Sequence, residues 1–394
     1  MWVANCTVID VEDPARSFTG ALRIEEGRIV ETSETAGRLG SETVDLGGRY
    51  LLPGLITCHV HLTEVYPFDA SDGESPATSA LRARAVAEAA LRAGVTTIRC
   101  VHETNRADLH LRHAHAQGWA PSTPRIFAGG QAITTTGGHG DGGGGCVRAD
   151  GPEEFLHAAQ DELAAGADHI KIFVSGGIGD ASENLSTVQM SLDEMAATVA
   201  AADTHGAYVV AHAGNSASIK VALEAGVRCF EHGYELDDVT ARVMAERGVF
   251  YTPTINVTHV RSWMLPRGFD ESQVRRAAEV EPMHARSLET AIRHGVTLVN
   301  GTDGAPAEPV EGTFMTAIEA ELMSEAGIGP LGALKAATLN AAQLLGAPEL
   351  GTTRVDGAAD LIAMPEDPTA DIRALRGIDW VMCRGAVVRA TEVP

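Results

Sequence analysis

Apolar and β-branched residues recur in eight short runs along the middle of the chain, and each run has the length of a buried strand. Segments with helical spacing lie between most of the runs, and glycines such as Gly166, Gly226 and Gly295 follow the helices. One helix opens with Ser191 and Glu194, which have the spacing of a capping box. The runs are Gly54–His61, Val95–Val101, Arg125–Gly129, His169–Ser175, Tyr208–His212, Val227–His232, Val249–Ile255 and Val296–Asp303. The predicted helices with the clearest boundaries are Pro152–Ala165, Ser191–Thr204, Ala217–Ala225, Asp238–Arg247 and Met283–His294.

Eight strands that alternate with helices predict an α/β fold, a (β/α)8 TIM barrel. An open doubly wound sheet is the alternative, but no G-x-G-x-x-G segment follows the first run. The two ends of the chain differ from the middle, because short strand-like segments separated by turns fill residues 1–56 and return after Gly351. We therefore predict that residues 1–56 and 351–394 meet in a small β-sandwich domain and that residues 57–350 form the barrel.

Composition and charge narrow the class of protein. Of the 394 residues, 44% are hydrophobic, which is enough for a large core, and the formal net charge is -23. Such a charge repels nucleic acids and anionic membranes, so we expect a small-molecule substrate as the partner. The sequence has no run of 18 apolar residues and no basic, apolar leader. The six cysteines are scattered without a C-x-x-C pair, which is typical of free thiols, and we expect a cytoplasmic protein.

Residue types that bind divalent metals lie at the ends of the predicted strands, where the active sites of such barrels are found. The first run ends in His59 and His61, and their spacing of two places both side chains on one face of the strand. His212, His232 and Asp303 end the fifth, sixth and eighth runs. A single strand histidine is usually structural, but imidazoles and a carboxylate that gather at one barrel mouth indicate a site for zinc or a similar ion.

Lys171 strengthens this interpretation. The chain has only three lysines, and this one lies inside the apolar run Ile170–Val174. A buried ammonium is costly unless it is paired or neutralised, so a lysine inside a barrel is seldom there for packing alone. One chemical solution is carboxylation by carbon dioxide, which gives an anionic group able to bridge two metal ions.

The order of these residues resembles the binuclear group of the amidohydrolase superfamily over essentially the whole chain. The resemblance implies one divalent ion held by His59, His61, carboxylated Lys171 and Asp303. The shared lysine carboxylate would hold a second ion together with two further histidines. It also implies zinc as the metal and a homo-oligomer. The motifs that carry it are P-G-L-I before His59-x-His61, strand-borne Lys171, A-H-A at His212, E-H-G at His232 and G-T-D at Asp303. Thr57 stands where the pattern commonly has aspartate, but that position is not a ligand.

Three segments resemble a narrower group, the Xaa-Pro and Xaa-Arg dipeptidases and ochratoxin-type amide hydrolases, which are related to imidazolonepropionase. These segments are the loop Thr136–Asp141, the run Lys171–Gly177 and the run Glu231–Asp238. The resemblance implies that His139 and Tyr234 face the substrate. The remaining histidines are expected to have packing or surface roles, with His102, at the end of the second run, as the strongest exception.

The expected reaction is hydrolysis of the amide bond of a small N-acyl or N-aminoacyl amino acid. A water that bridges two metal ions has a pKa lowered toward neutrality, and Asp303 would take its proton and return it to the leaving nitrogen. A hydrolase of cyclic amides, lactones, carbamates or ureas on the same site is the alternative. A binding protein without metals is disfavoured because all six ligands that the resemblance implies are present. Arg99, unusual in an apolar strand, is predicted to form an ion pair inside the barrel.

Overall fold

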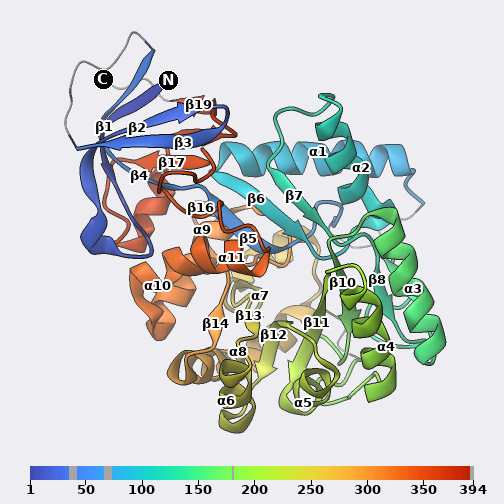
Figure 1. Cartoon of the computed structure of the whole chain (residues 1–394). Helices are drawn as coiled ribbons and strands as arrows, with labels where there is room; N and C mark the ends of the chain where they lie inside the picture. The colour runs from blue at the N-terminus through green and yellow to red at the C-terminus, as the bar shows by residue number, and fades with distance from the viewer. Residues whose placement is uncertain (35–41, 66–72, 180–181, 391–394) are drawn as a thin grey trace.

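Parallel strands and helices alternate through the middle of the chain in the computed structural model, which describes residues 1–34, 42–65, 73–179 and 182–390 (Figure 1). One parallel sheet has the order β5-β6-β7, and the other has the order β14-β13-β12-β11-β10-β8-β9. The strands are β5 (Leu55–Val60), β6 (Val95–Cys100), β7 (Arg125–Ala128), β8 (Ala132–Thr134), β9 (Cys146–Arg148), β10 (His169–Phe173), β11 (Tyr208–Asn215), β12 (Cys229–Glu235), β13 (Phe250–Thr252) and β14 (Thr297–Leu298). Each of the eight predicted strands therefore has a counterpart.

The two parallel sheets adjoin at both ends of this strand order. The predicted third strand corresponds to β7 in one sheet, and residues 129–131 connect it to β8, a short strand of the other sheet that was not predicted. At the opposite edge the amide of Cys58 donates to the carbonyl of Asn300 at 2.7 Å, and Val60 forms a parallel bridge with Gly304. The last strand is thus held directly against the first.

The helices begin and end close to the predicted residues, with one exception. Ser191 and Glu194 form the predicted capping box. The exception is the helix expected at Met283–His294, which begins twelve residues earlier, at Glu271, and runs through Pro282. Asp270 caps it, and a buried apolar stripe continues across the proline, so packing outweighs the hydrogen bond that a proline removes. The helices are α1 (Pro76–Arg92), α2 (Ala107–Ala116), α3 (Pro152–Ala165), α4 (Leu192–Asp203), α5 (Ser216–Ala225), α6 (Asp238–Glu246), α7 (Asn256–His259), α8 (Glu271–His294), α9 (Met315–Met323), α10 (Gly329–Ala336) and α11 (Leu339–Leu344).

Strands from both ends of the chain share one further sheet, and in Figure 1 the blue strands of the N-terminal part lie beside the red strands of the C-terminal part. Its order is β19-β18-β17-β4-β1-β2-β3, so strands from the two predicted terminal segments form one hydrogen-bonded, seven-stranded sheet. The two ends meet where β4 pairs with β17 in antiparallel register. The strands are β1 (Trp2–Val8), β2 (Phe18–Glu25), β3 (Arg28–Ser33), β4 (Thr43–Pro53), β17 (Leu361–Met364), β18 (Trp380–Cys383) and β19 (Ala386–Ala390).

Apolar clusters pack on these sheets, and one of them joins the terminal sheet to β5 and β6 through residues such as Leu52, Val95 and Ile362. Buried residues such as Leu22, Ile29 and Trp380 pack together at the terminal sheet. Around the second parallel sheet, Ile170 and Phe230 pack with Phe155 of α3 and other helical residues. None of the helices in the described ranges combines the length and the apolarity required to cross a membrane.

Candidate metal centre

A cavity of about 840 Å³ lies at the carboxyl ends of the parallel strands. β5, β10, β11 and β12 each contribute at least one of the predicted site residues, and the others directly follow a strand or lie in a loop. The structure brings all eight of these residues to the cavity wall. They are His59, His61, His139, Lys171, His212, His232, Tyr234 and Asp303.

Three of the predicted ligands form a compact group. The Nε2 atom of His59 lies 3.0 Å from Oδ1 of Asp303, and the Nε2 atom of His61 lies 3.3 Å from the same oxygen. The ligand atoms of the three residues all lie within 4.8 Å of one another, a spacing that suits a single metal ion. Burial acts to lower the pKa of His61, but Glu64, Asp303 and Glu103 together raise it to about 9. The surroundings of this group therefore favour a positive charge.

The other predicted ligands lie beside this group. The ring centroids of His212 and His232 are 4.5 Å apart, and Nδ1 of His232 is 3.8 Å from Oδ2 of Asp303. Lys171 is 1% exposed, and burial lowers its pKa to about 8, so its amine loses its proton more readily than that of an ordinary lysine. Burial also holds the pKa of both histidines well below the usual value, and the neutral imidazole is the form that binds metals.

Each of the four histidines has one ring nitrogen against an oxygen of the protein. Histidines that bind metals almost always make such a contact, because it fixes the ring and directs the other nitrogen at the ion. The donor set therefore fits a pair of divalent ions. The contacts are His59 Nδ1 with the Glu231 carboxylate at 2.5 Å, His61 Nδ1 with the His102 carbonyl at 3.2 Å, His212 Nε2 with the Gly176 carbonyl at 3.2 Å and His232 Nδ1 with the Thr254 hydroxyl at 2.8 Å.

The backbone is unusual at three of these positions. His232, Thr254 and Asp303 have φ angles of 68°, 47° and 52°, in the left-handed region that residues other than glycine rarely adopt. Such conformations cost of order 1–3 kcal/mol each and gather at functional sites. At His232 the effect is direct. There the backbone departs from regular strand geometry, and Glu231 and His232 both contact His59 although they are neighbours in the sequence.

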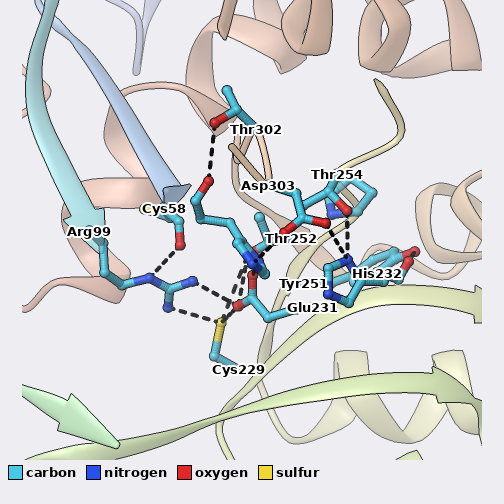
Figure 2. A network of polar contacts seen from close by, with 12 residues as sticks. Cys58, Arg99, Cys229, Glu231, His232, Tyr251, Thr252, Thr254, Thr302 and Asp303 are labelled. Atoms are coloured by element: carbon cyan, nitrogen blue, oxygen red, sulfur yellow. Dashed lines mark hydrogen bonds and ion pairs between the residues drawn. The ribbon is translucent and has the colours of Figure 1, made fainter. Parts of the chain in front are cut away.

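A buried network lies behind the candidate ligands (Figure 2). Arg99 donates from Nη2 to Oε1 of Glu231 at 2.7 Å, and both side chains are fully buried, which confirms the predicted ion pair inside the strands. Although burial acts to raise it, Arg99 and His59 hold the pKa of Glu231 well below its usual range. The sequence analysis did not single out Glu231, whose only signal was its place in the E-H-G motif.

The two residues predicted to face the substrate stack on candidate ligands. The ring of His139 lies 4.3 Å from that of His212, and its Nδ1 atom pairs with the Glu183 carboxylate at 2.8 Å. The ring of Tyr234 lies 5.4 Å from that of His232, at an interplanar angle of 13°.

Two other histidines differ in their relation to the cavity. His102 borders it, with its ring 4.5 Å from that of His61, so this position is closer to the site than its sequence context alone indicated. His169 is not among the lining residues and stacks on Tyr208, in agreement with a packing role.

A cavity at the carboxyl ends of parallel strands, with a cluster of histidine and carboxylate groups, is typical of a metal-dependent enzyme. The chain belongs to the amidohydrolase family, whose sequence profile matches residues 50–388. Members of this family generally bind divalent metals, which agrees with the group formed by His59, His61 and Asp303.

The similar proteins include the groups named in the sequence analysis. An ochratoxinase of Aspergillus niger is 30% identical over 356 residues, which cover 83% of this chain and 72% of the relative. An imidazolonepropionase of Sphingopyxis alaskensis is 25% identical over 381 residues, with 87% and 85% covered. The structure of a Xaa-Pro dipeptidase with bound methionine in its active site has a TM-score of 0.89 and 29% identity, and 99% of each chain is covered. The predicted relationship is confirmed.

Proposed function

We propose that this protein hydrolyses the amide bond of a small N-acyl or N-aminoacyl amino acid at a pair of divalent ions, within a closed (β/α)8 barrel. The observation that carries the proposal is the meeting of all six predicted ligands at one cavity, with each histidine oriented by an oxygen behind it. The names of similar proteins, which include a Xaa-Pro dipeptidase and an ochratoxinase, support an amide substrate.

The residues divide into two groups of ligands. His59, His61 and Asp303 would hold one ion, His212 and His232 would hold the other, and a carboxylated Lys171 would be shared. Zinc is the metal that this combination of imidazole and carboxylate ligands suits best. When bound, such ions polarise a substrate carbonyl and lower the pKa of a water molecule toward neutrality.

Asp303 has the position required for proton transfer. One of its oxygens faces His59 and His61, and the other lies toward His232, so the carboxylate spans the two groups of ligands. From there it accepts the proton of the attacking water and delivers it to the departing nitrogen. Amide cleavage depends on the second transfer because an unprotonated amide nitrogen is a very poor leaving group.

His139 is the proposed contact for the carboxylate of the substrate. Because its Nδ1 atom is engaged by Glu183, the ring can meet a substrate only through Nε2. With Nδ1–H donated to Glu183, a proton on Nε2 gives a charge-assisted donor, which suits a carboxylate.

The acyl half of the substrate would lie against an apolar wall. The segment after β13 contributes most of this wall, and Trp263 packs against the buried cluster that contains Val260 and Met315. The ring of Trp263 lies 5.5 Å from that of Phe269, so the two aromatic side chains form a continuous surface. We therefore expect apolar acyl groups to be preferred. The wall residues that border the cavity are Val257, Val260, Trp263, Met264, Phe269 and Met315.

The test compares N-acyl amino acids that carry apolar acyl groups with the same compounds amidated at the C-terminal carboxylate. We expect amidation to lower kcat/KM by roughly tenfold or more, because one charge-assisted hydrogen bond of ~1.5–3 kcal/mol is lost. His139→Ala should remove most of that discrimination, whereas His157→Ala, on α3, should keep it. Equal turnover of acid and amide, or activity confined to lactones, carbamates or cyclic ureas, would contradict the proposed substrate. Neither result would contradict the proposed metal centre.

A further inference from the structure

His59 differs from the other three candidate histidine ligands in the group behind its ring. His61, His212 and His232 have a neutral oxygen there, from a carbonyl or a hydroxyl group. His59 has the carboxylate of Glu231, whose Oε2 atom lies 2.5 Å from Nδ1. A charged acceptor makes a stronger hydrogen bond than a neutral one. It also makes the ring a more basic ligand.

Glu231 has no access to solvent, and all its described partners belong to the protein interior. Its second oxygen, Oε1, accepts from Arg99 at 2.7 Å, from the thiol of Cys229 at 3.1 Å and from the hydroxyl of Thr252 at 3.2 Å. Oε2 therefore contacts His59, whereas Oε1 anchors the carboxylate to residues such as Arg99 and Cys229 (Figure 2).

Arg99 connects the carboxylate to the strand that carries His59. Its Nε atom donates to the carbonyl of Cys58 at 2.5 Å, and Cys58 is the residue directly before His59. One guanidinium therefore fixes both the backbone of β5 beside His59 and the acid behind the ring. Its charge also balances that of Glu231, because an isolated carboxylate at this depth would be costly.

We propose that Arg99 and Glu231 are positioning residues that set the tautomer and the orientation of His59. With Nδ1–H donated to Glu231, the Nε2 atom of His59 carries the lone pair and faces Asp303. The pair thereby sets the affinity of the metal site that His59 shares with His61 and Asp303. This inference rests on the proposed metal centre.

The alternative is a buried ion pair that serves only the fold. Replacing both partners of such a pair by neutral groups of similar volume often leaves stability unchanged. The double variant Arg99→Met/Glu231→Gln therefore separates the two roles. It removes both charges together and leaves no unpaired ion in the interior.

The experiment measures the zinc affinity of the metal-stripped protein by competition with a chromophoric chelator, and stability by thermal unfolding. We expect the double variant to bind one of two zinc ions about 10–100-fold more weakly than the wild type. The matched control is Arg106→Met/Glu162→Gln, which removes another ion pair, 2.6 Å long, that does not border the cavity. We expect wild-type zinc affinity in the control even where its stability falls.

A second variant covers the case in which the double variant does not fold. Glu231→Asp keeps the charge beside Arg99 but withdraws the carboxylate from His59 by one methylene, and it should also weaken zinc binding at least tenfold. Wild-type zinc affinity in either folded Glu231 variant would overturn the inference, as would an equal loss in the control. A wild-type protein that binds no metal would instead contradict the proposed function.

Discussion

The two halves of the candidate metal centre are supported in different ways. In the half formed by His59, His61 and Asp303, the ring of His59 contacts the buried carboxylate of Glu231, which is paired with the buried guanidinium of Arg99. Behind His212 and His232 lie only a backbone carbonyl and a hydroxyl group. The four histidines are buried in both halves, whereas the side chain of Asp303 is 24% exposed. In the first half a carboxylate orients His59 and a backbone carbonyl orients His61, whereas both histidines of the second half are oriented by neutral oxygens.

In the second half no charged group supports the histidines, but the backbone is strained at two positions. His232 and the residue that supports it, Thr254, both have left-handed φ angles. In the first half His59 lies within the regular strand β5, and only Asp303 is left-handed. The amides of Thr302 and Asp303 both donate to the carbonyl of His59, at 2.9 and 3.0 Å, so the first strand holds that strained turn in place.

The largest expected effect falls on the residue that spans both halves. Asp303→Asn removes a ligand and the proposed proton carrier together, and kcat should fall by about 10²–10⁴-fold or more. The chain should still fold because the residue lies at the cavity and not in an apolar cluster. Steady-state kinetics on metal-loaded protein check this. A decrease of less than about tenfold, which is only ~1.4 kcal/mol of barrier, would show that Asp303 is not the general base.

The next largest effect concerns the proposed bridge between the halves. Lys171→Arg keeps a cation but has no primary amine to carboxylate, so both ions should be lost with most of the activity. We expect metal affinity to fall beyond the roughly 10–100-fold typical of losing a partner behind a ligand. Elemental analysis of the purified protein measures this. Lys220→Arg, at an exposed lysine paired with Asp237, is the control. Two bound ions and near-full activity in Lys171→Arg would refute the bridge.

A smaller effect, confined to the first half, is expected at Gly301. A Cβ atom there would lie 2.4 Å from Cγ2 of Thr252 and 2.7 Å from Cβ of His59, so Gly301→Ala has to displace His59. We expect the metal content to fall from two ions toward one per chain, with the His212 half retained. Gly179→Ala, where a Cβ meets open space, should keep both ions. If Gly301→Ala also binds both ions at wild-type affinity, the first half tolerates displacement and is less precisely oriented than we infer.

The smallest effect is expected at the hydroxyl group behind His232. Thr254→Val keeps the β-branched shape and removes one neutral hydrogen bond, worth about 0.5–1.5 kcal/mol. Zinc affinity should therefore weaken by only about two- to tenfold, less than in the Glu231 variants. Chelator competition on the two proteins side by side measures the ratio. Equal losses at Thr254 and Glu231 would remove the distinction between the two halves.

Most of the architecture could be read from the sequence because it follows from local patterns. Apolar runs located the parallel strands, and the cap at Ser191 located the start of its helix. The spacing of His59 and His61 predicted that both side chains share a face, and both contact Asp303. These features depend on residues that are close together in the chain.

The parts that could not be predicted depend on distant residues or on the backbone itself. Simple alternation places Glu231 and His232 on opposite faces, but the backbone at His232 is left-handed and both residues contact His59. The partner of His139 is Glu183, 44 positions away, on a loop without a recognisable pattern. The helix predicted at Met283–His294 begins at Glu271 and contains Pro282. In each case tertiary contacts override the local preference.

The contact between the first and the last parallel strands also has a consequence for how the protein is made. Thr302, whose hydroxyl donates a hydrogen bond to the carbonyl of His59, lies 243 positions after His59 in the chain. Ribosomes add about 5–20 residues per second, so roughly 10–50 s pass between the synthesis of the two ends of the site. Throughout that interval His59 and His61 have no Asp303 beside them. The growing chain therefore cannot assemble this half of the site until the residues around Asp303 have been synthesised.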